Sequence, residues 1–143
     1  MRIALACDHG GFELKQEIKK QLISEGYDII DLGTDSEDSV DYPIYGKLCA
    51  EAVAAGKAER GIVCCGTGIG ISIAANKVNG IRCALCTDTN MAEMTRKHND
   101  SNVLALGGRV LDTNAALDIT KTWLKTEFEG GRHKRRVDML DEM

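Results

Sequence analysis

A strand, a glycine-rich loop and a helix follow one another directly at residues 60–72, and this segment constrains the fold more than any other. Ile62–Cys65 is a short apolar run with the composition of a buried strand. Glycines occupy positions 66, 68 and 70, and residues 69–78 have the small apolar composition of a helix. Such a loop directs several free backbone N–H groups, at the positive end of a helix dipole, toward one point. The segment therefore predicts an anion-binding loop with the Cys65 thiol at the tip of the strand.

Two familiar glycine motifs do not fit this loop. The dinucleotide-binding pattern G-x-G-x-x-G requires glycine at position 71, where this chain has Ile71. No Gly-Lys-Ser/Thr sequence follows, so the loop is not a P-loop. A tight strand-to-helix turn with a buried cysteine remains the structural alternative to an active site.

Strand-like and helix-like segments alternate five times along the chain, which predicts a parallel sheet with helices on both faces. The expected fold is a three-layer, Rossmann-like α/β/α sandwich with a five-stranded parallel sheet. Ligands of such sheets bind outside the carboxyl ends of the strands. Besides the central strand, the expected strands are 2–7, 27–32, 82–86 and 102–106. The expected inward helix residues are Leu14, Ile18 and Leu22; Ile44, Leu48 and Ala52; Met91, Met94 and His98; and Ala116, Ile119, Trp123 and Leu124.

Length and charge place the chain in an ordinary class. Its 143 residues predict one domain, 1–143, with a basic helical tail at about 131–143. The formal charge of −4 argues against a nucleic-acid-binding protein, which would be strongly basic. The chain starts with a strand-like segment and contains no run of 18 apolar residues, so we expect no signal peptide or membrane contact and a cytoplasmic location.

The six cysteines predict neither a disulfide framework nor a metal site. Most lie in apolar runs, as reduced core thiols of a cytosolic protein do. Cys83 and Cys86 form a C-x-x-C sequence, but they lie on a predicted strand, where residues three apart point to opposite faces. We therefore expect no metal ligands in this chain.

Polar residues that could carry chemistry follow several of the strands. Asp8 and His9 follow the first strand, and Arg109 follows the fifth. The simpler interpretation is that Asp8 caps the next helix and His9 is solvated. His98, near the end of a helix, has a simple alternative role in stabilising the helix dipole.

Arg132 and Arg136 are four residues apart, so a helical tail would present both on one face. Adjacent guanidinium groups repel unless an anion lies between them, and phosphate is the usual one; a solvated basic tail is the alternative. We expect the thiol, both histidines, the carboxylate and the arginines to share one edge of the sheet. That set indicates acid/base chemistry on a small phosphorylated substrate, without a cofactor.

The chain resembles the type B ribose-5-phosphate isomerases, whose family also contains galactose-6-phosphate and allose-6-phosphate isomerases. The resemblance extends from end to end. It is carried by CDHGGFELK (7–15), DYPIYG (41–46), CCGTGIGISIAANK (64–77), KHND (97–100), NVLALGGRV (102–110) and GGRHKRRV (130–137). The intact DHGG resembles the ribose-phosphate branch, and the thiol of Cys65 resembles the cysteine-dependent members.

The resemblance implies interconversion of D-ribose 5-phosphate and D-ribulose 5-phosphate through a cis-enediolate, a reaction of the pentose phosphate pathway. Cys65 would be the base and His98 the acid that opens the sugar ring, with Asp8 and Thr67 assisting at the hydroxyls. The remaining implied roles are enediolate stabilisation by backbone amides of Gly66, Thr67, Gly68, Ile69 and Gly70; phosphate binding by His9, Arg109, Arg132 and Arg136; and pocket lining by Tyr42 and Asn99.

Family resemblance also implies a homodimer or homotetramer with active sites shared between subunits, and it implies no metal or other cofactor. Two alternatives remain open. The substrate could instead be allose 6-phosphate or galactose 6-phosphate. A non-catalytic nucleotide-binding module, with Asp31 as the ribose-binding acid, belongs to a different class, and the missing third glycine argues against it.

Overall fold

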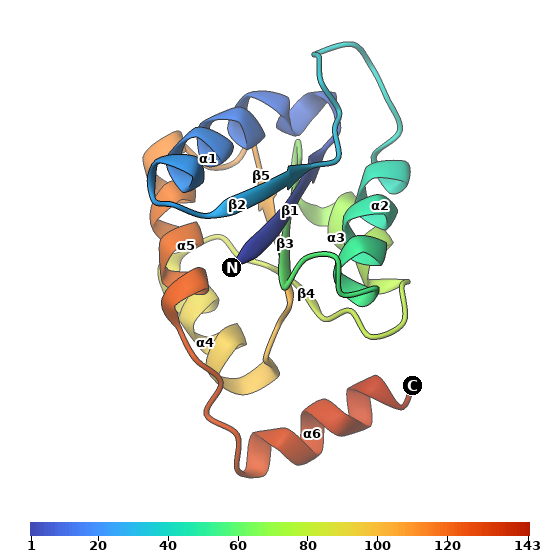
Figure 1. Cartoon of the computed structure of the whole chain (residues 1–143), viewed down its shortest axis with the longest axis vertical. Helices are drawn as coiled ribbons and strands as arrows, with labels where there is room; N and C mark the ends of the chain where they lie inside the picture. Colours follow the sequence, from blue (N-terminus) through green and yellow to red (C-terminus); the bar gives the residue numbers. More distant parts are fainter.

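A five-stranded parallel sheet forms the centre of the protein, in the strand order β2-β1-β3-β5-β4 (Figure 1). The structure is a computed structural model that describes all 143 residues. Each neighbouring pair of strands is parallel, as the alternation of strands and helices predicts. The strands are β1 (Arg2–Cys7), β2 (Asp28–Asp31), β3 (Arg60–Cys65), β4 (Cys83–Leu85) and β5 (Val103–Gly107).

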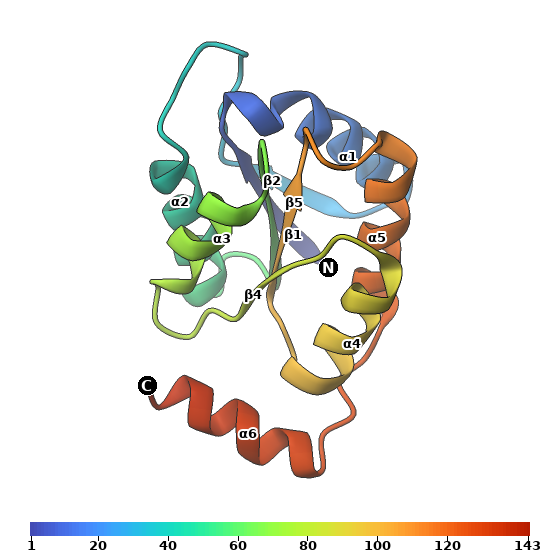
Figure 2. The same cartoon turned by 180° about the vertical axis from the view of Figure 1, so that it is seen from behind.

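Helices cover both faces of this sheet, so the expected three-layer sandwich is confirmed (Figures 1 and 2). One face carries α1 (Phe12–Ser24), α4 (Thr89–Asn99) and α5 (Thr113–Lys125). The other carries α2 (Tyr42–Ala54) and α3 (Ile69–Asn76). The last helix, α6 (Arg132–Asp141), lies apart from both layers, below α4 in Figure 1. No helix combines the length and the apolar character needed to cross a membrane.

The two faces of the sheet have cores of different composition. Beneath α1 and α5 the core is built from large side chains, including the fully buried Trp123, Ile18 and Leu104. Beneath α2 and α3 it consists mainly of alanine, cysteine and valine. Small side chains let these two helices approach the sheet and each other closely. The first turns of α2 and α3 consequently lie against each other, with the Tyr42 ring close to Gly70.

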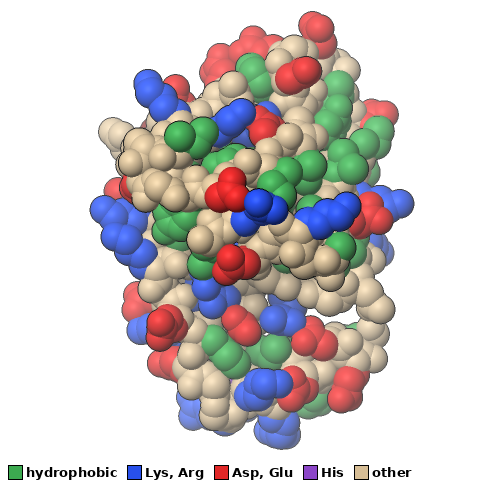
Figure 3. Space-filling view, in the orientation of Figure 1, with side chains coloured by type: hydrophobic (Ala, Val, Ile, Leu, Met, Phe, Trp, Pro, Cys, Tyr) green, Lys and Arg blue, Asp and Glu red, His purple; other side chains and the backbone are tan.

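Two of the predicted inward faces are wrong in part, although Ala52 of α2 is buried as expected. On α2, Ile44 and Leu48 are exposed, and the buried residues are Gly46, Cys49, Ala50 and Ala52. Hydrophobic side chains consequently show on the surface of the molecule around α2 (Figure 3). Small residues take the inner positions because α2 packs tightly on α3, where a methyl group at Gly46 would lie 3.0 Å from Ile71.

On α4, Met91 is exposed and Met94 is half-buried. The inner face of the helix consists instead of Ala92, Thr95 and Arg96. Arg96 can be buried because its guanidinium donates to Asp100, to the Ser101 carbonyl and to the Thr126 carbonyl.

The other helix expectations agree closely with the structure. The predicted inward residues of α1 and α5 are all buried. Asp112 accepts a hydrogen bond from the Ala115 amide and thereby caps α5, and Asp88 caps α4 through the Met91 amide. The ends of α3 and of four strands differ from the predicted bounds by one or two residues, as helix and strand ends commonly do.

Candidate active site

The loops after β1, β3 and β5 are joined by backbone hydrogen bonds at the carboxyl edge of the sheet. The Asp8 amide donates to the Cys64 carbonyl (3.2 Å), and the Gly108 amide donates to the Cys65 carbonyl (2.8 Å). A third hydrogen bond, from the Arg109 amide to the Gly66 carbonyl (2.9 Å), joins the loops that follow β5 and β3. Asp8, Cys65 and Arg109 are therefore held at one edge, as predicted. That edge includes the gap between β1 and β3, where the chain connections diverge and where ligands of such sheets bind.

Cys65 differs from the other cysteines in its hydrogen bonding. Its Sγ accepts the backbone N–H of Gly68 (3.1 Å), and no other cysteine sulfur accepts an N–H. Burial raises the pKa of Cys7 to about 11 and that of Cys49 to about 12, so these are inert core thiols. An amide at the start of a helix stabilises negative charge on sulfur. The geometry thus suits Cys65 to act as a thiolate.

The glycine loop keeps several amides free around that sulfur. Gly68 adopts a left-handed conformation (φ 81°), and a methyl group there would lie 2.6 Å from Leu85. Beyond the bond to Cys65, the Ile69 amide donates to the Thr67 hydroxyl (3.2 Å). The amides without a protein acceptor are those of Gly66, Thr67, Gly70 and Ile71. These free donors match the predicted anion cradle.

Asp8 and His9 are oriented by local hydrogen bonds. The Asp8 carboxylate is buried and accepts the Gly11 amide (3.1 Å), which caps a short 3₁₀ turn. Asp8 therefore caps this turn and also lies at the same edge of the sheet as Cys65. Nδ1 of His9 accepts the Val40 amide (3.1 Å), so the neutral imidazole carries its proton on Nε2. That nitrogen makes no hydrogen bond within the protein and is available to a ligand.

Arg109 and Tyr42 lie directly on the glycine segments. A methyl group at Gly66 would lie 3.3 Å from Nη1 of Arg109, and one at Gly70 would lie 2.6 Å from the Tyr42 ring. Arg109 is exposed, and its guanidinium pairs with no carboxylate. Together with His9 and the carboxylates of Glu13 and Glu37 it lines a hollow of about 290 Å³. An unpaired guanidinium beside a histidine N–H is suited to bind a phosphate group.

The predicted grouping of all candidate residues at one edge is wrong for His98, Asn99, Arg132 and Arg136. Helix α4 starts at the carboxyl end of β4 and runs back along the sheet, so its last residues lie at the opposite edge (Figures 1 and 2). Arg82, just before β4, donates to the Asn99 carbonyl (2.9 Å) and pairs with Asp141 of α6 (2.5 Å). Within one chain, His98, the residue expected to open the sugar ring, is therefore distant from Cys65.

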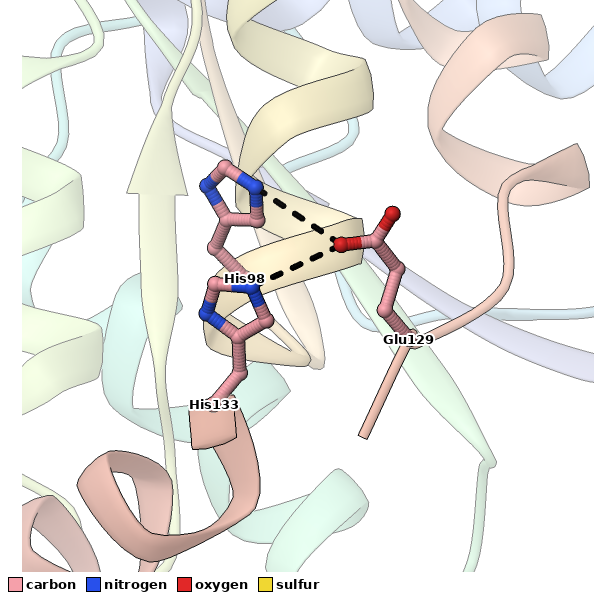
Figure 4. A group of neighbouring side chains, drawn as sticks. All are labelled: His98, Glu129 and His133. Atoms are coloured by element: carbon pink, nitrogen blue, oxygen red, sulfur yellow. Dashed lines mark ion pairs between the residues drawn. The ribbon is translucent and has the colours of Figure 1, made fainter. Parts of the chain in front are cut away.

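A second cluster forms at this opposite edge, where His98, Glu129 and His133 face one another (Figure 4). Nε2 of His98 lies 3.8 Å from Oε1 of Glu129, and Nε2 of His133 lies 3.5 Å from the same oxygen. The imidazole rings stack with a centroid distance of 4.3 Å. Desolvation lowers the pKa of His133, and the charges of His98 and Arg132 add to that effect. Glu129 and His133 are not among the residues expected from the sequence, although their i,i+4 spacing at the start of a helical tail is a usable signal.

The tail arginines are free to bind an anion. Arg132 and Arg136 are exposed on α6, and neither forms an ion pair within the chain. The largest cavity, about 600 Å³, lies between α6 and the body of the domain and includes Asn99 in its lining. One chain thus contains two separate groups of candidate residues, here called half-sites. One contains the thiol and the glycine loop, and the other contains His98 and the basic face of α6.

The Asp31 carboxylate is engaged in hydrogen bonds and ion pairs within the chain. It accepts hydrogen bonds from Lys15 (2.8 Å), Lys19 (3.0 Å) and the Gly33 amide. Although burial opposes it, the contact with Lys15 lowers the pKa of Asp31. The carboxylate balances the buried Lys15 ammonium and is not free to bind a ribose hydroxyl.

Comparison with known proteins agrees with this architecture. Residues 3–140 match the Ribose/Galactose Isomerase family. The chain is 49% identical to ribose-5-phosphate isomerase B of Escherichia coli, over 97% of this chain and 93% of that one. The structure of ribose-5-phosphate isomerase B from Clostridium thermocellum superimposes with a TM-score of 0.99 at 58% identity, covering 99% of this chain and 96% of the other.

A further solved structure, that of the Mycoplasma genitalium enzyme with bound ribulose 5-phosphate, gives a TM-score of 0.94 at 37% identity and covers 99% of this chain and 94% of that one. Sequence and structure therefore agree over nearly the whole length. The chain belongs to the ribose/galactose isomerase family.

Proposed function

We propose that this protein interconverts D-ribose 5-phosphate and D-ribulose 5-phosphate, with Cys65 as the base. The observation that carries the proposal is the hydrogen bond from the Gly68 amide to Cys65 Sγ, next to four amides that have no acceptor. An aldose–ketose isomerase needs a base beside donors that stabilise an enediolate, and this loop supplies both. The names of the relatives in E. coli and C. thermocellum, and the ligand of the M. genitalium structure, support the same substrate pair.

In the aldose-to-ketose direction, the Cys65 thiolate removes the proton from C2. The electron pair of that C–H bond forms the C1–C2 double bond, and the negative charge moves to oxygen. Free amides of the loop, including those of Gly66 and Gly70, stabilise this oxyanion. The O2 proton then passes to O1, which places the negative charge on O2. As the C2–O2 double bond forms, the C1–C2 electron pair takes the proton back from the Cys65 thiol at C1, which gives the ketose and restores the thiolate. The reaction changes no net oxidation state and therefore consumes no redox cofactor.

Ring opening is assigned to the second half-site, and phosphate binding to residues of both half-sites. His98 would protonate the ring oxygen of the furanose, and Asn99 would line the pocket beside it. Asp8 and Thr67 would contact the sugar hydroxyls from the Cys65 side. Phosphate would be bound by four cationic or N–H-bearing side chains, His9, Arg109, Arg132 and Arg136, of which the three arginines have no carboxylate partner in the chain.

We propose that a second copy of the chain brings the two half-sites together. Within one chain they occupy opposite edges of the sheet (Figure 1). Around the glycine loop, the outer faces of α2 and α3 expose a set of large apolar side chains, which a partner subunit would cover. They are Tyr42, Ile44, Leu48, Ile69 and Ile73. In a two-fold dimer each chain would lend His98 and the α6 arginines to the Cys65 loop of its partner.

Mixing two inactive variants tests both the chemistry and the sharing of sites. We expect Cys65→Ala and His98→Asn each to lose isomerisation of ribose 5-phosphate when assayed alone. After joint unfolding and refolding, half of the dimers are hybrids, and each hybrid contains one site with an intact Cys65 and an intact His98. Activity should return to about a quarter of that of the unmutated protein. Failure of the mixture to gain activity would contradict shared sites.

Substrate preference within the family is tested by ranking kcat/KM for ribose 5-phosphate, allose 6-phosphate and galactose 6-phosphate. We expect ribose 5-phosphate to rank first, because the chain has the intact DHGG segment at Asp8–Gly11. A six-carbon sugar in first place would replace the proposed substrate while keeping the reaction.

A further inference from the structure

We propose that His98, Glu129 and His133 form a binding site for a first-row transition-metal ion, represented by Zn²⁺, and that the bound ion inhibits the isomerase. The three side chains come from the end of α4, the connection before α6, and the first turn of α6. Metal binding rests on these residues alone, whereas the inhibition also rests on the proposed role of His98.

The ligand set and its spacing suit zinc. Two imidazoles and one carboxylate, with a fourth position open, are a set that zinc uses in proteins. At metal–ligand distances of about 2.0–2.1 Å, tetrahedral ligand atoms lie about 3.3–3.4 Å apart. In this chain Oε1 of Glu129 lies 3.5 Å from His133 and 3.8 Å from His98, and the three ligand atoms are all within 4.8 Å of one another. The ligand atoms therefore lie somewhat farther apart than in an occupied site, and the side chains would rotate to draw them together.

The backbone already fixes the positions from which the ligands extend. The Glu129 amide donates to the Lys97 carbonyl (3.2 Å), so the carboxylate is tied to the turn of α4 that carries His98. His133 follows four residues later, is mostly buried, and packs its ring on His98. The stacked rings, 17° from parallel, must open into a wedge so that both Nε2 lone pairs point at one ion. His98 has room for this rotation because its side chain is 41% exposed.

Both histidine nitrogens point toward the carboxylate, and the carboxylate is half exposed, so an ion can enter from solvent (Figure 4). An ion held there takes the Nε2 lone pair of His98, and that nitrogen can no longer carry the proton that opens the sugar ring. Zn²⁺, Ni²⁺ and Co²⁺ favour imidazole, whereas Mg²⁺ prefers an all-oxygen octahedral shell. The site should therefore discriminate between these ions, and Mg²⁺ should leave the enzyme unaffected.

Binding is tested on the purified protein by titration with Zn²⁺ and, separately, with Co²⁺ as a spectroscopic probe. We expect one ion per chain and a cobalt spectrum without a thiolate charge-transfer band. Glu129→Gln and His133→Asn should each weaken Zn²⁺ binding by at least about 10–100-fold, the loss typical of even an indirect metal contact. Glu127→Gln is the matched control, because Glu127 is an exposed acid on the same connection but outside the cluster, and it should bind Zn²⁺ normally.

Inhibition is tested with the same variants, each first confirmed to be folded. Zn²⁺ should inhibit the unmutated enzyme and the Glu127→Gln control equally, and chelation should restore activity. Glu129→Gln should need at least about 10-fold more Zn²⁺ for the same inhibition.

Zinc could also inhibit through the Cys65 thiol. Equal zinc sensitivity in Glu129→Gln and the unmutated enzyme, or a thiolate band in the cobalt spectrum that disappears in Cys65→Ser, would overturn the site. If the protein lacked isomerase activity, the proposed function would fail, but the binding result would still decide the metal site.

Discussion

Cys64 and Cys65 are adjacent in β3, but their thiols lie in different cores on opposite faces of the sheet. Cys64 belongs to the large-residue core under α1 and α5, together with Cys7 and Leu106. Cys65 belongs to the small-residue core under α2 and α3, and only it meets the amide of Gly68. Burial raises the pKa of Cys64 well above its ordinary value. One step along a strand therefore separates a structural thiol from a thiol suited to catalysis.

Replacing the two cysteines separately should have contrasting effects. Cys64→Ala should keep normal turnover and lose about 1–2 kcal/mol of unfolding free energy, because it leaves a small cavity in a packed core. Cys65→Ala should fold normally but lose exchange of the substrate C2 proton with solvent deuterium by at least about 10²–10⁴-fold, the usual contribution of a general base. Denaturant unfolding and NMR of the substrate proton measure the two effects. Near-normal exchange in Cys65→Ala would remove Cys65 from the base role.

The arginines of α6 should affect substrate binding more than the chemical step. Arg132→Ala and Arg136→Ala each remove a charge-assisted contact to the phosphate, which should cost roughly 1.5–3 kcal/mol and appear mainly as a higher KM. Lys134→Ala is the matched control, since Lys134 is also an exposed cation of α6 but lies on the opposite side of the helix from Arg132 and Arg136. Steady-state kinetics with ribose 5-phosphate and with phosphate-free ribose distinguish a lost phosphate contact from a general effect on catalysis. An equal fractional loss with both sugars would exclude a phosphate contact.

His98→Asn should harm the reaction of the cyclic aldose more than that of the open-chain ketose. Only the furanose needs its ring oxygen protonated before the C2 proton can be removed. Single-turnover rates from ribose 5-phosphate and from ribulose 5-phosphate give the comparison, with the imidazole of His133 left in place. Equal losses in the two directions would place His98 outside the ring-opening step.

Removal of metal ions should not impair the enzyme. The proposed proton transfer uses a thiol and backbone amides, and the metal-binding cluster at His98 is inhibitory in our proposal. Extended EDTA treatment should therefore leave kcat unchanged, or raise it if the preparation contains zinc. A rate that falls with EDTA and recovers on addition of a divalent ion would contradict metal-independent catalysis.

Much of this protein could be predicted from local patterns in the sequence. The alternation of apolar strands and amphipathic helices predicted the five-stranded parallel sheet and its helices on both faces. The glycine spacing after Cys65 predicted the anion cradle, because left-handed glycine and free first-turn amides are local properties. The separation of Cys83 from Cys86, which lie in different cores, followed from the two-residue period of a strand.

Tertiary structure alone decided what depends on the direction and packing of whole elements. The inner face of α2 includes Gly46, because α3 lies close enough to exclude a larger side chain, and Cys49, which packs on Gly61 of the sheet; no periodicity in α2 contains that information. His98 lies at the edge opposite Cys65 because a helix that follows a parallel strand must run back along the sheet. Its meeting with Glu129 and His133 depends on the path of the chain between α5 and α6, which joins residues far apart in sequence. Local sequence thus determined the chemistry of each half-site, and the fold determined that one chain keeps them apart.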